Sequence, residues 1–297
     1  MLSDLLAQVA DLAVLVFAVT SMLSVGFTYS ARQILLPLRD VWALLRALLA
    51  NFVLVPLLVL GILRLWPIDR PLAAGLLLVA LAAGAPFLVK LTAVAQSEVP
   101  LSATLLVLLL PVTVLYAPVV VPRVLPEAEV SFGALAVPLL LSMLLPLAGA
   151  LLVNSRWPGR ARQWGPVARR VSTVTLVVLV VATTLANIPT IIDLFTDGAI
   201  VPPLLMIVGA FVIGYLLGGR DRDAREVLGL GTAQRNISAA TVMATQGFDD
   251  NGTLVMVIVT SLASFALLFP LAGMLRKRGT KATARSGAGT TNVRGVG

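Results

Sequence analysis

The sequence predicts an all-α integral membrane protein with about nine transmembrane helices, and its composition and hydropathy pattern are the observations that predict this fold class. Of the 297 residues, 59% are hydrophobic and only 12% are charged, whereas a soluble domain has about 25% charged residues. The mean hydropathy is +1.00. A chain this apolar cannot cover a surface that faces water, so we expect its solvent to be the lipid bilayer.

Nine apolar stretches follow one another along the chain, and each is long enough to cross the hydrocarbon core, which takes about 20 residues as a helix. They run approximately over Val9–Tyr29, Ala43–Trp66, Leu72–Ala95, Leu101–Val121, Phe132–Val153, Val167–Asn187, Ile200–Gly218, Ala224–Gln246 and Leu254–Leu275. Backbone groups in lipid must pair within their own segment, so these stretches are predicted to be helices. A β-barrel would instead show short alternating segments.

The connectors alternate in charge, which predicts the orientation of the chain. Basic residues gather after the first, fifth and seventh stretches and after the last, at Arg32, Arg39, Arg156, Arg160, Arg162, Arg169, Arg170, Arg220, Arg222, Arg225, Arg276, Lys277, Arg278, Lys281 and Arg285. The opposite connectors are mostly acidic. The positive-inside rule therefore predicts a cell (inner) membrane protein with its N-terminus outside and its C-terminus in the cytoplasm. We expect residues 1–278 to form the transmembrane domain and residues 279–297 a disordered basic tail.

The composition excludes several classes of function. The chain has no cysteine and no histidine, so thiol and imidazole catalysis and thiolate metal sites are excluded. No carboxylate lies deep within a stretch, which argues against an enzyme, and we expect no cofactor and no metal site. The net charge of +8 belongs to short connectors, so it indicates membrane topology control and no nucleic acid partner.

Two cations lie inside apolar stretches, where a charge costs roughly 2.5–3.5 kcal/mol. Lys90 lies in the third stretch and Arg235 in the eighth. Each is either a structural anchor bonded to backbone carbonyls or part of a functional site. Because no carboxylate is available to neutralise them, the pair favours an anionic ligand.

Both stretches also contain residues that interrupt a helix. Gly84 and Pro86 precede Lys90, and Gly229 and Gly231 precede Arg235, so we predict a helix break at each pair. Polar residues surround these breaks and are our candidates for substrate or ion binding, together with Lys90 and Arg235: Asn51, Thr92, Thr232, Gln234, Asn236 and Ser238. The two interrupted stretches are five apart and cross the membrane in opposite directions. Such inverted repeats, with broken helices that meet at mid-membrane, are typical of secondary transporters.

Several motifs resemble those of a known family. In order, they are Ser21–Gly26, Asn51–Pro56, Gly84-Ala85-Pro86, Ser97–Ser102 and Gln234–Ala240. In this order and at this spacing the chain resembles the bile acid:sodium symporter superfamily, up to about Arg278. The resemblance implies a core and a panel built from inverted repeats, two broken helices that cross in the core, a substrate between core and panel, and alternating access.

The chain departs from the family where sodium-using members bind their ions. The resemblance places Gly231 at the position of a family glutamate, Arg235 at the following glutamine and Lys90 near a family asparagine. We therefore interpret Lys90 and Arg235 as fixed cations that replace the two sodium ions. Transport would be uniport, exchange or H⁺-linked through Lys90.

The function predicted is secondary transport of a small organic anion without bound sodium. One alternative is a sodium-coupled symporter of the same fold that binds Na⁺ through Asn51, Thr92, Gln234, Asn236 and backbone carbonyls. A second alternative, from another class, is a membrane receptor or assembly subunit that does not transport.

Overall fold

The computed structural model of the chain describes residues 2–30, 40–85, 87–97, 99–125, 132–186, 188–248 and 250–288, and helices joined by short breaks and turns make up these residues. The helices of the first half are α1 (Leu2–Thr28), α3 (Val41–Leu49), η2 (Ala50–Leu54), α4 (Val55–Leu65), α5 (Arg70–Leu81), α6 (Leu88–Ala95) and α7 (Val99–Val124). Then follow α8 (Phe132–Leu139), η3 (Leu140–Leu144), α9 (Leu145–Arg156), α10 (Pro158–Ala186), α11 (Ile188–Thr196), α12 (Val201–Leu217), α13 (Arg222–Ala233), α14 (Ile237–Gly247) and α15 (Asn251–Ala288).

Apart from the short helix α11, these helices correspond to the nine apolar stretches. The α3–η2–α4 and α8–η3–α9 segments are continuous rods, and α5/α6 and α13/α14 are each one interrupted stretch. Within the described residues, four helices are long and apolar enough to span a bilayer: Val41–Leu65, Leu101–Val124, Phe132–Arg156 and Asn251–Lys277. Shorter apolar helices accompany them. The prediction of an all-α membrane protein is confirmed.

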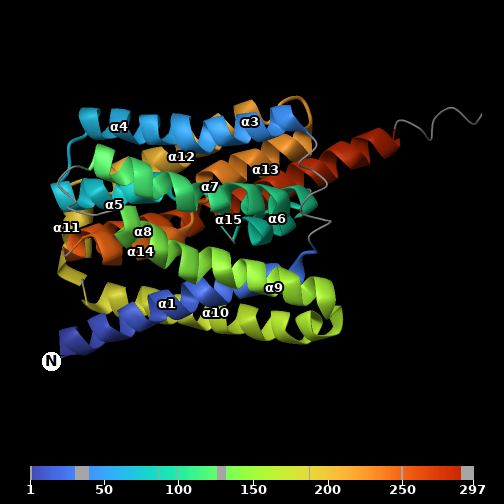
Figure 1. Cartoon of the computed structure of the whole chain (residues 1–297). Coiled ribbons are helices and arrows are strands. Elements are labelled where there is room, and N and C mark those ends of the chain that lie inside the picture. Colours follow the sequence, from blue (N-terminus) through green and yellow to red (C-terminus); the bar gives the residue numbers. More distant parts are fainter. Residues whose placement is uncertain are drawn as a thin grey trace, which may run out of the picture.

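The helices form two layers (Figure 1). One layer, the panel, consists of α1, α10 and the α8–η3–α9 rod, in which α1 packs along both α10 and α9. The other layer, the core, contains the two interrupted stretches together with α3–η2–α4, α7, α12 and α15. Contacts of α1 and α8 with α14, and of α10 with α15, join panel to core. This division matches the core and panel arrangement that the resemblance implied.

The C-terminal segment differs from its prediction. We expected residues 279–297 to be disordered, but α15 continues as a helix to Ala288 and extends beyond the bundle. The first ten residues of the expected tail are therefore helical, and residues 289–297 lie outside the described residues. A helix already formed in the membrane propagates because adding each further residue costs no new nucleation.

A proline explains the π-helical turn η2 in the α3–η2–α4 rod. Pro56 has no N–H to donate to the carbonyl of Phe52, four residues earlier. The Tyr116 hydroxyl of α7 donates to that carbonyl oxygen at 2.6 Å. The widened turn η2 directly precedes Pro56 and contains the buried residue Asn51. This π turn positions Asn51 in the core.

Candidate functional site

The first interrupted stretch breaks where it was predicted. Helix α5 ends at Leu81 and α6 begins at Leu88. Gly84 lies between them with a φ of +81°, a conformation that favours glycine. A Cβ at Gly84 would lie 2.8 Å from the backbone nitrogen of Leu110, so α7 also requires glycine here. Pro86, the other predicted break residue, lies outside the described residues.

The second interrupted stretch breaks later than predicted. Helix α13 continues through Gly229 and Gly231 to Ala233, so these two glycines are not the break. They allow close packing instead: a Cβ at Gly229 would lie 3.0 Å from the Phe211 ring, and one at Gly231 would lie 3.0 Å from Leu88. A glycine within a helix only weakens it by about 1 kcal/mol, which neighbouring helices offset.

The break of the second stretch is set by Asn236. Its side-chain oxygen accepts a hydrogen bond from the backbone N–H of Ala239 at 3.1 Å and caps the N-terminus of α14. Asparagine is among the strongest N-cap residues. The two preceding residues, Gln234 and Arg235, connect α13 to this cap.

Asn236 also joins the two breaks to each other. Its backbone N–H donates to the carbonyl of Ala82 at 2.9 Å, and its side-chain amide donates to the carbonyl of Gly84 at 2.9 Å. Thr113 of α7 satisfies the carbonyl of Ala83 at 3.0 Å. Two discontinuous helices therefore cross in the core, and their freed backbone groups pair with each other and with a hydroxyl.

Arg235 lies at this crossing and is 2% exposed. Its Nη1 donates to the side-chain oxygen of Asn51 at 3.2 Å, and the Asn51 amide nitrogen lies 3.4 Å from the Thr232 hydroxyl. The structure thus brings together three of the predicted site residues. Arg235 directly follows the C-terminal end of α13, where the helix dipole favours a positive charge.

The other polar candidates divide into two groups. Near Arg235, the side-chain oxygens of Gln234 and Ser238, like Nε and Nη2 of Arg235, are buried without a hydrogen-bond partner among the described residues. Thr92 lies elsewhere in the core. Its hydroxyl is 3.1 Å from the carbonyl of Leu88 and 3.0 Å from the Ser102 hydroxyl, so it joins α6 to α7.

The sequence suggested that Lys90 lies beside Arg235, but in the structure it does not. It is an exposed residue of α6, and its ammonium group lies 4.9 Å from the centre of the Phe87 ring. Because α6 begins at Leu88, Lys90 lies in its first turn and projects from the core toward the panel. The prediction of two cations at one crossing is therefore wrong, and only Arg235 occupies it.

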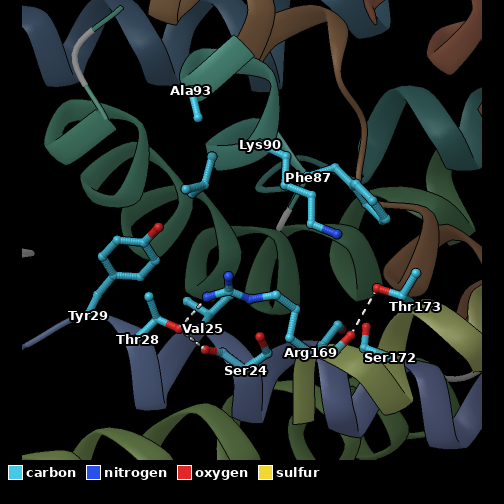
Figure 2. Close-up of a pocket in the computed structure, with 12 residues that line it drawn as sticks. Ser24, Val25, Thr28, Tyr29, Phe87, Lys90, Ala93, Arg169, Ser172 and Thr173 are labelled. Carbon is cyan, nitrogen blue, oxygen red and sulfur yellow. Dashed lines mark hydrogen bonds between the residues drawn. The ribbon is translucent and has the colours of Figure 1, made fainter. Parts of the chain in front are cut away.

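Lys90 faces a cavity of about 290 Å³ between panel and core (Figure 2). The core wall is formed by α6 and Phe87, and the panel wall by α1 and α10. The lining residues are Ser21, Ser24, Val25, Thr28, Tyr29, Phe87, Val89, Lys90, Ala93, Arg169, Ser172 and Thr173. The cavity thus combines an apolar surface with hydroxyl groups, two cations and no acidic residue.

Arg169 is the functional candidate that sequence reasoning missed. It lies on α10, reaches the cavity from the wall opposite Lys90, and donates to the Thr28 hydroxyl at 3.2 Å. In the sequence it belongs to a run of basic residues before an apolar stretch, which is also what topology control produces. Only the packing of α1 against α10 distinguishes it from its neighbours.

A second cavity, of about 480 Å³, lies between the same two layers nearer to the other end of α1. Its lining residues are Leu15, Val19, Pro138, Leu141, Ser142, Val242, Thr245 and Gln246, none of which is charged. The described part of the panel–core interface therefore contains a cavity beside α6 and another beside α14.

An all-α membrane protein with two crossing broken helices and a cavity between two layers has the architecture of a secondary transporter. The chain matches the Sodium Bile acid symporter family over residues 14–194, which is more than half of its length, and it belongs to that family. No curated protein matches the chain. The family match ends before α13, so it does not extend to Arg235.

A hard cation needs several free oxygen ligands, and the oxygens at the crossing differ in this respect. Those of Ala82, Gly84 and Asn51 already accept hydrogen bonds, whereas the side-chain oxygens of Gln234 and Ser238 have no hydrogen-bond partner among the described residues. Position 231 is a glycine. No cluster of three or more acidic residues, cysteines or histidines occurs in the part of the chain that the structure describes.

Proposed function

We propose that this transporter carries a small organic anion by alternating access without bound sodium, with the Arg235 guanidinium as the fixed cation of the crossing. The observation that carries the proposal is the hydrogen bond from buried Arg235 to Asn51, between the second broken helix and the η2 turn. It supplies a positive charge where sodium-using relatives are expected to bind an ion.

The cavity beside α6 supports an anionic substrate. Lys90 and Arg169 are the charged residues that line it, and their positive charges favour the binding of a negatively charged group. The hydroxyl of Ser24 can donate a hydrogen bond to such a group, while Val25 and Phe87 suit an apolar body. The hydroxyls of Thr28 and Thr173 already donate to the carbonyls of Ser24 and Arg169. Pockets with apolar walls and a few polar groups are typical of small-molecule sites.

The two cavities support alternating access. One lies beside α6 and the other beside α14, and these helices are the second halves of the two broken stretches. A shift of core against panel that closes one cavity and widens the other would expose the crossing to opposite sides in turn.

The proposed orientation places the cavity with Lys90 on the cytoplasmic side. The ends of α9 and α10 beside this cavity carry Arg156, Arg160 and Arg162, and the start of α13 carries Arg222. Positive residues gather on the cytoplasmic side of membrane proteins. In this orientation the N-terminus lies outside and the C-terminus in the cytoplasm of the cell membrane.

The test is uptake of labelled anion into proteoliposomes that contain the purified protein and are preloaded with the same unlabelled anion, with pyruvate, benzoate and cholate as probes. We expect the same initial rate in sodium as in N-methylglucamine, because no step involves Na⁺. Uptake that rises steeply with sodium would identify a sodium-coupled symporter instead. No uptake and no stabilisation by any of the three anions would favour a receptor or assembly subunit.

A further inference from the structure

We infer that the protein is an obligate anion exchanger, in which the empty carrier does not change sides. The inference rests on the proposed function and concerns the charges in the cavity beside α6. Lys90 belongs to the core and Arg169 to the panel, so any movement of core against panel changes the surroundings of both cations. Figure 2 shows the two side chains reaching into the same cavity from opposite walls.

Among the described residues that line the cavity, none carries a negative charge that could neutralise these cations. Its other lining residues are apolar side chains, hydroxyl residues and an alanine. The groups that these cations contact are neutral as well: the Phe87 ring for Lys90 and the Thr28 hydroxyl for Arg169. While the cavity is open, Lys90 and Arg169 are exposed, and water screens their repulsion.

Closing the empty cavity removes that water. It leaves two like charges between apolar walls, and each cation moved from water into a membrane interior disfavours the closed form by about 100-fold. An anion bound between the two walls cancels the repulsion and supplies hydrogen-bond acceptors to both cations. The loaded carrier can therefore close and change sides, whereas the empty carrier waits for another anion.

In sodium-coupled relatives, bound ions are expected to leave together with the substrate, so the site returns without its charges. Here the cations are covalent parts of the chain and cannot leave. Fixed charges in the cavity that only a bound anion can neutralise thus predict exchange of one anion for another, rather than net uptake by uniport or symport.

The transport experiment compares proteoliposomes preloaded with unlabelled benzoate with empty ones, both with the membrane potential held at zero. We expect labelled benzoate, and likewise pyruvate or cholate, to enter loaded vesicles at least about 100-fold faster than empty ones. Equal initial rates would overturn the exchange inference but leave the carrier itself intact. The failure of the two proposals is therefore distinguishable.

A second measurement needs no substrate. The chain contains no cysteine, so a Ser24→Cys protein carries one thiol, which lines the cavity. We expect a water-soluble maleimide to label it rapidly in the absence of anion, because the empty cavity stays open. Adding Lys90→Gln should slow the labelling, since a neutral wall permits closure.

The matched control is Lys90→Arg in the same Ser24→Cys protein. This variant keeps the positive charge and should be labelled at the original rate. Arg169→Gln provides the second neutral variant, on the panel wall. If both neutral variants fold, as judged by an unchanged melting temperature, and still label as fast as the parent, fixed charge does not hold the cavity open and the inference is wrong.

Discussion

The crossing and the cavity each contain one of the two cations that lie inside apolar stretches of the sequence. The two cations differ in burial and in their contacts. At the crossing, Arg235 is buried, bonded to Asn51 and surrounded by backbone groups that pair with each other. In the cavity, Lys90 is exposed, contacts a neutral ring and faces Arg169. One cation is part of the structure of the core, while the other is open to a ligand.

This difference follows from where each residue lies relative to its helix break. Arg235 lies between α13 and α14, inside the interruption, so its side chain must enter the core. Lys90 lies within α6, after the interruption, on the face turned toward the panel. Substitutions at the crossing should therefore change stability, and substitutions in the cavity should change anion affinity alone.

The largest effect on stability is expected for Gly84→Ala. The positive φ costs about 1–2 kcal/mol for a residue with a side chain, and the added Cβ would also overlap the backbone of α7 at Leu110. We expect a total loss of at least about 3 kcal/mol in the free energy of unfolding, measured in detergent. Gly61→Ala is the control, since a Cβ there would meet nothing within 4 Å. Equal stability of the two variants would contradict a tightly fixed crossing.

The next effect is expected for Asn236→Ala. This change removes the cap of α14 and leaves the carbonyl of Gly84 without its donor. Loss of an N-cap costs about 1 kcal/mol, and an unsatisfied buried carbonyl costs about 1–3 kcal/mol more. Chemical denaturation would measure the sum. Asn154→Ala removes two side-chain hydrogen bonds within the panel and should leave the crossing, and hence transport, unaffected.

Lys90→Ala should separate the two regions most clearly. We expect the free energy of unfolding to stay within about 0.5 kcal/mol of the parent, because the side chain is exposed. The affinity for benzoate should fall about tenfold or more, since a charge-assisted hydrogen bond contributes roughly 1.5–3 kcal/mol. Thermal shift and isothermal titration measure both quantities. A protein that melts much earlier but binds as before would place Lys90 among the structural anchors.

The smallest effect is expected for Thr28→Val, which keeps the shape of the panel wall but removes the oxygen that Arg169 donates to. Arg169 remains charged and loses only its orientation. We expect a loss of affinity of about fivefold or less, equivalent to one modest hydrogen bond. A loss as large as that for Lys90→Ala would mean that the threonine itself binds the anion.

The sequence predicted the membrane class, the order of the nine stretches and the first helix break, because hydropathy and a glycine with a required conformation are local signals. It misplaced the second break, since Gly229 and Gly231 could equally loosen a helix or admit the neighbours Phe211 and Leu88. It also missed Arg169 and paired Lys90 with Arg235. Both errors concern contacts between distant helices, for which one sequence contains no signal.

The buried carboxylate Glu226 illustrates the same limit. It lies in the first turns of α13, where it is 3% exposed, accepts a hydrogen bond from Ser97 and pairs with Arg222 at 2.7 Å. Arg222 in turn donates to the carbonyl of Leu275. This network joins three segments, namely α13, α15 and the turn that follows α6. No pattern in the sequence connects these segments.

The proposal that Arg235 takes the place of a bound sodium ion can be tested by measuring the binding of radioactive ²²Na⁺ to the purified protein. The parent protein should show no saturable binding, whereas Gly231→Glu combined with Arg235→Gln should gain it, because that pair restores a carboxylate and removes the cation. Leu88, the nearest neighbour of position 231, is a flexible side chain that can give way. Saturable binding of ²²Na⁺ by the parent protein would contradict the account.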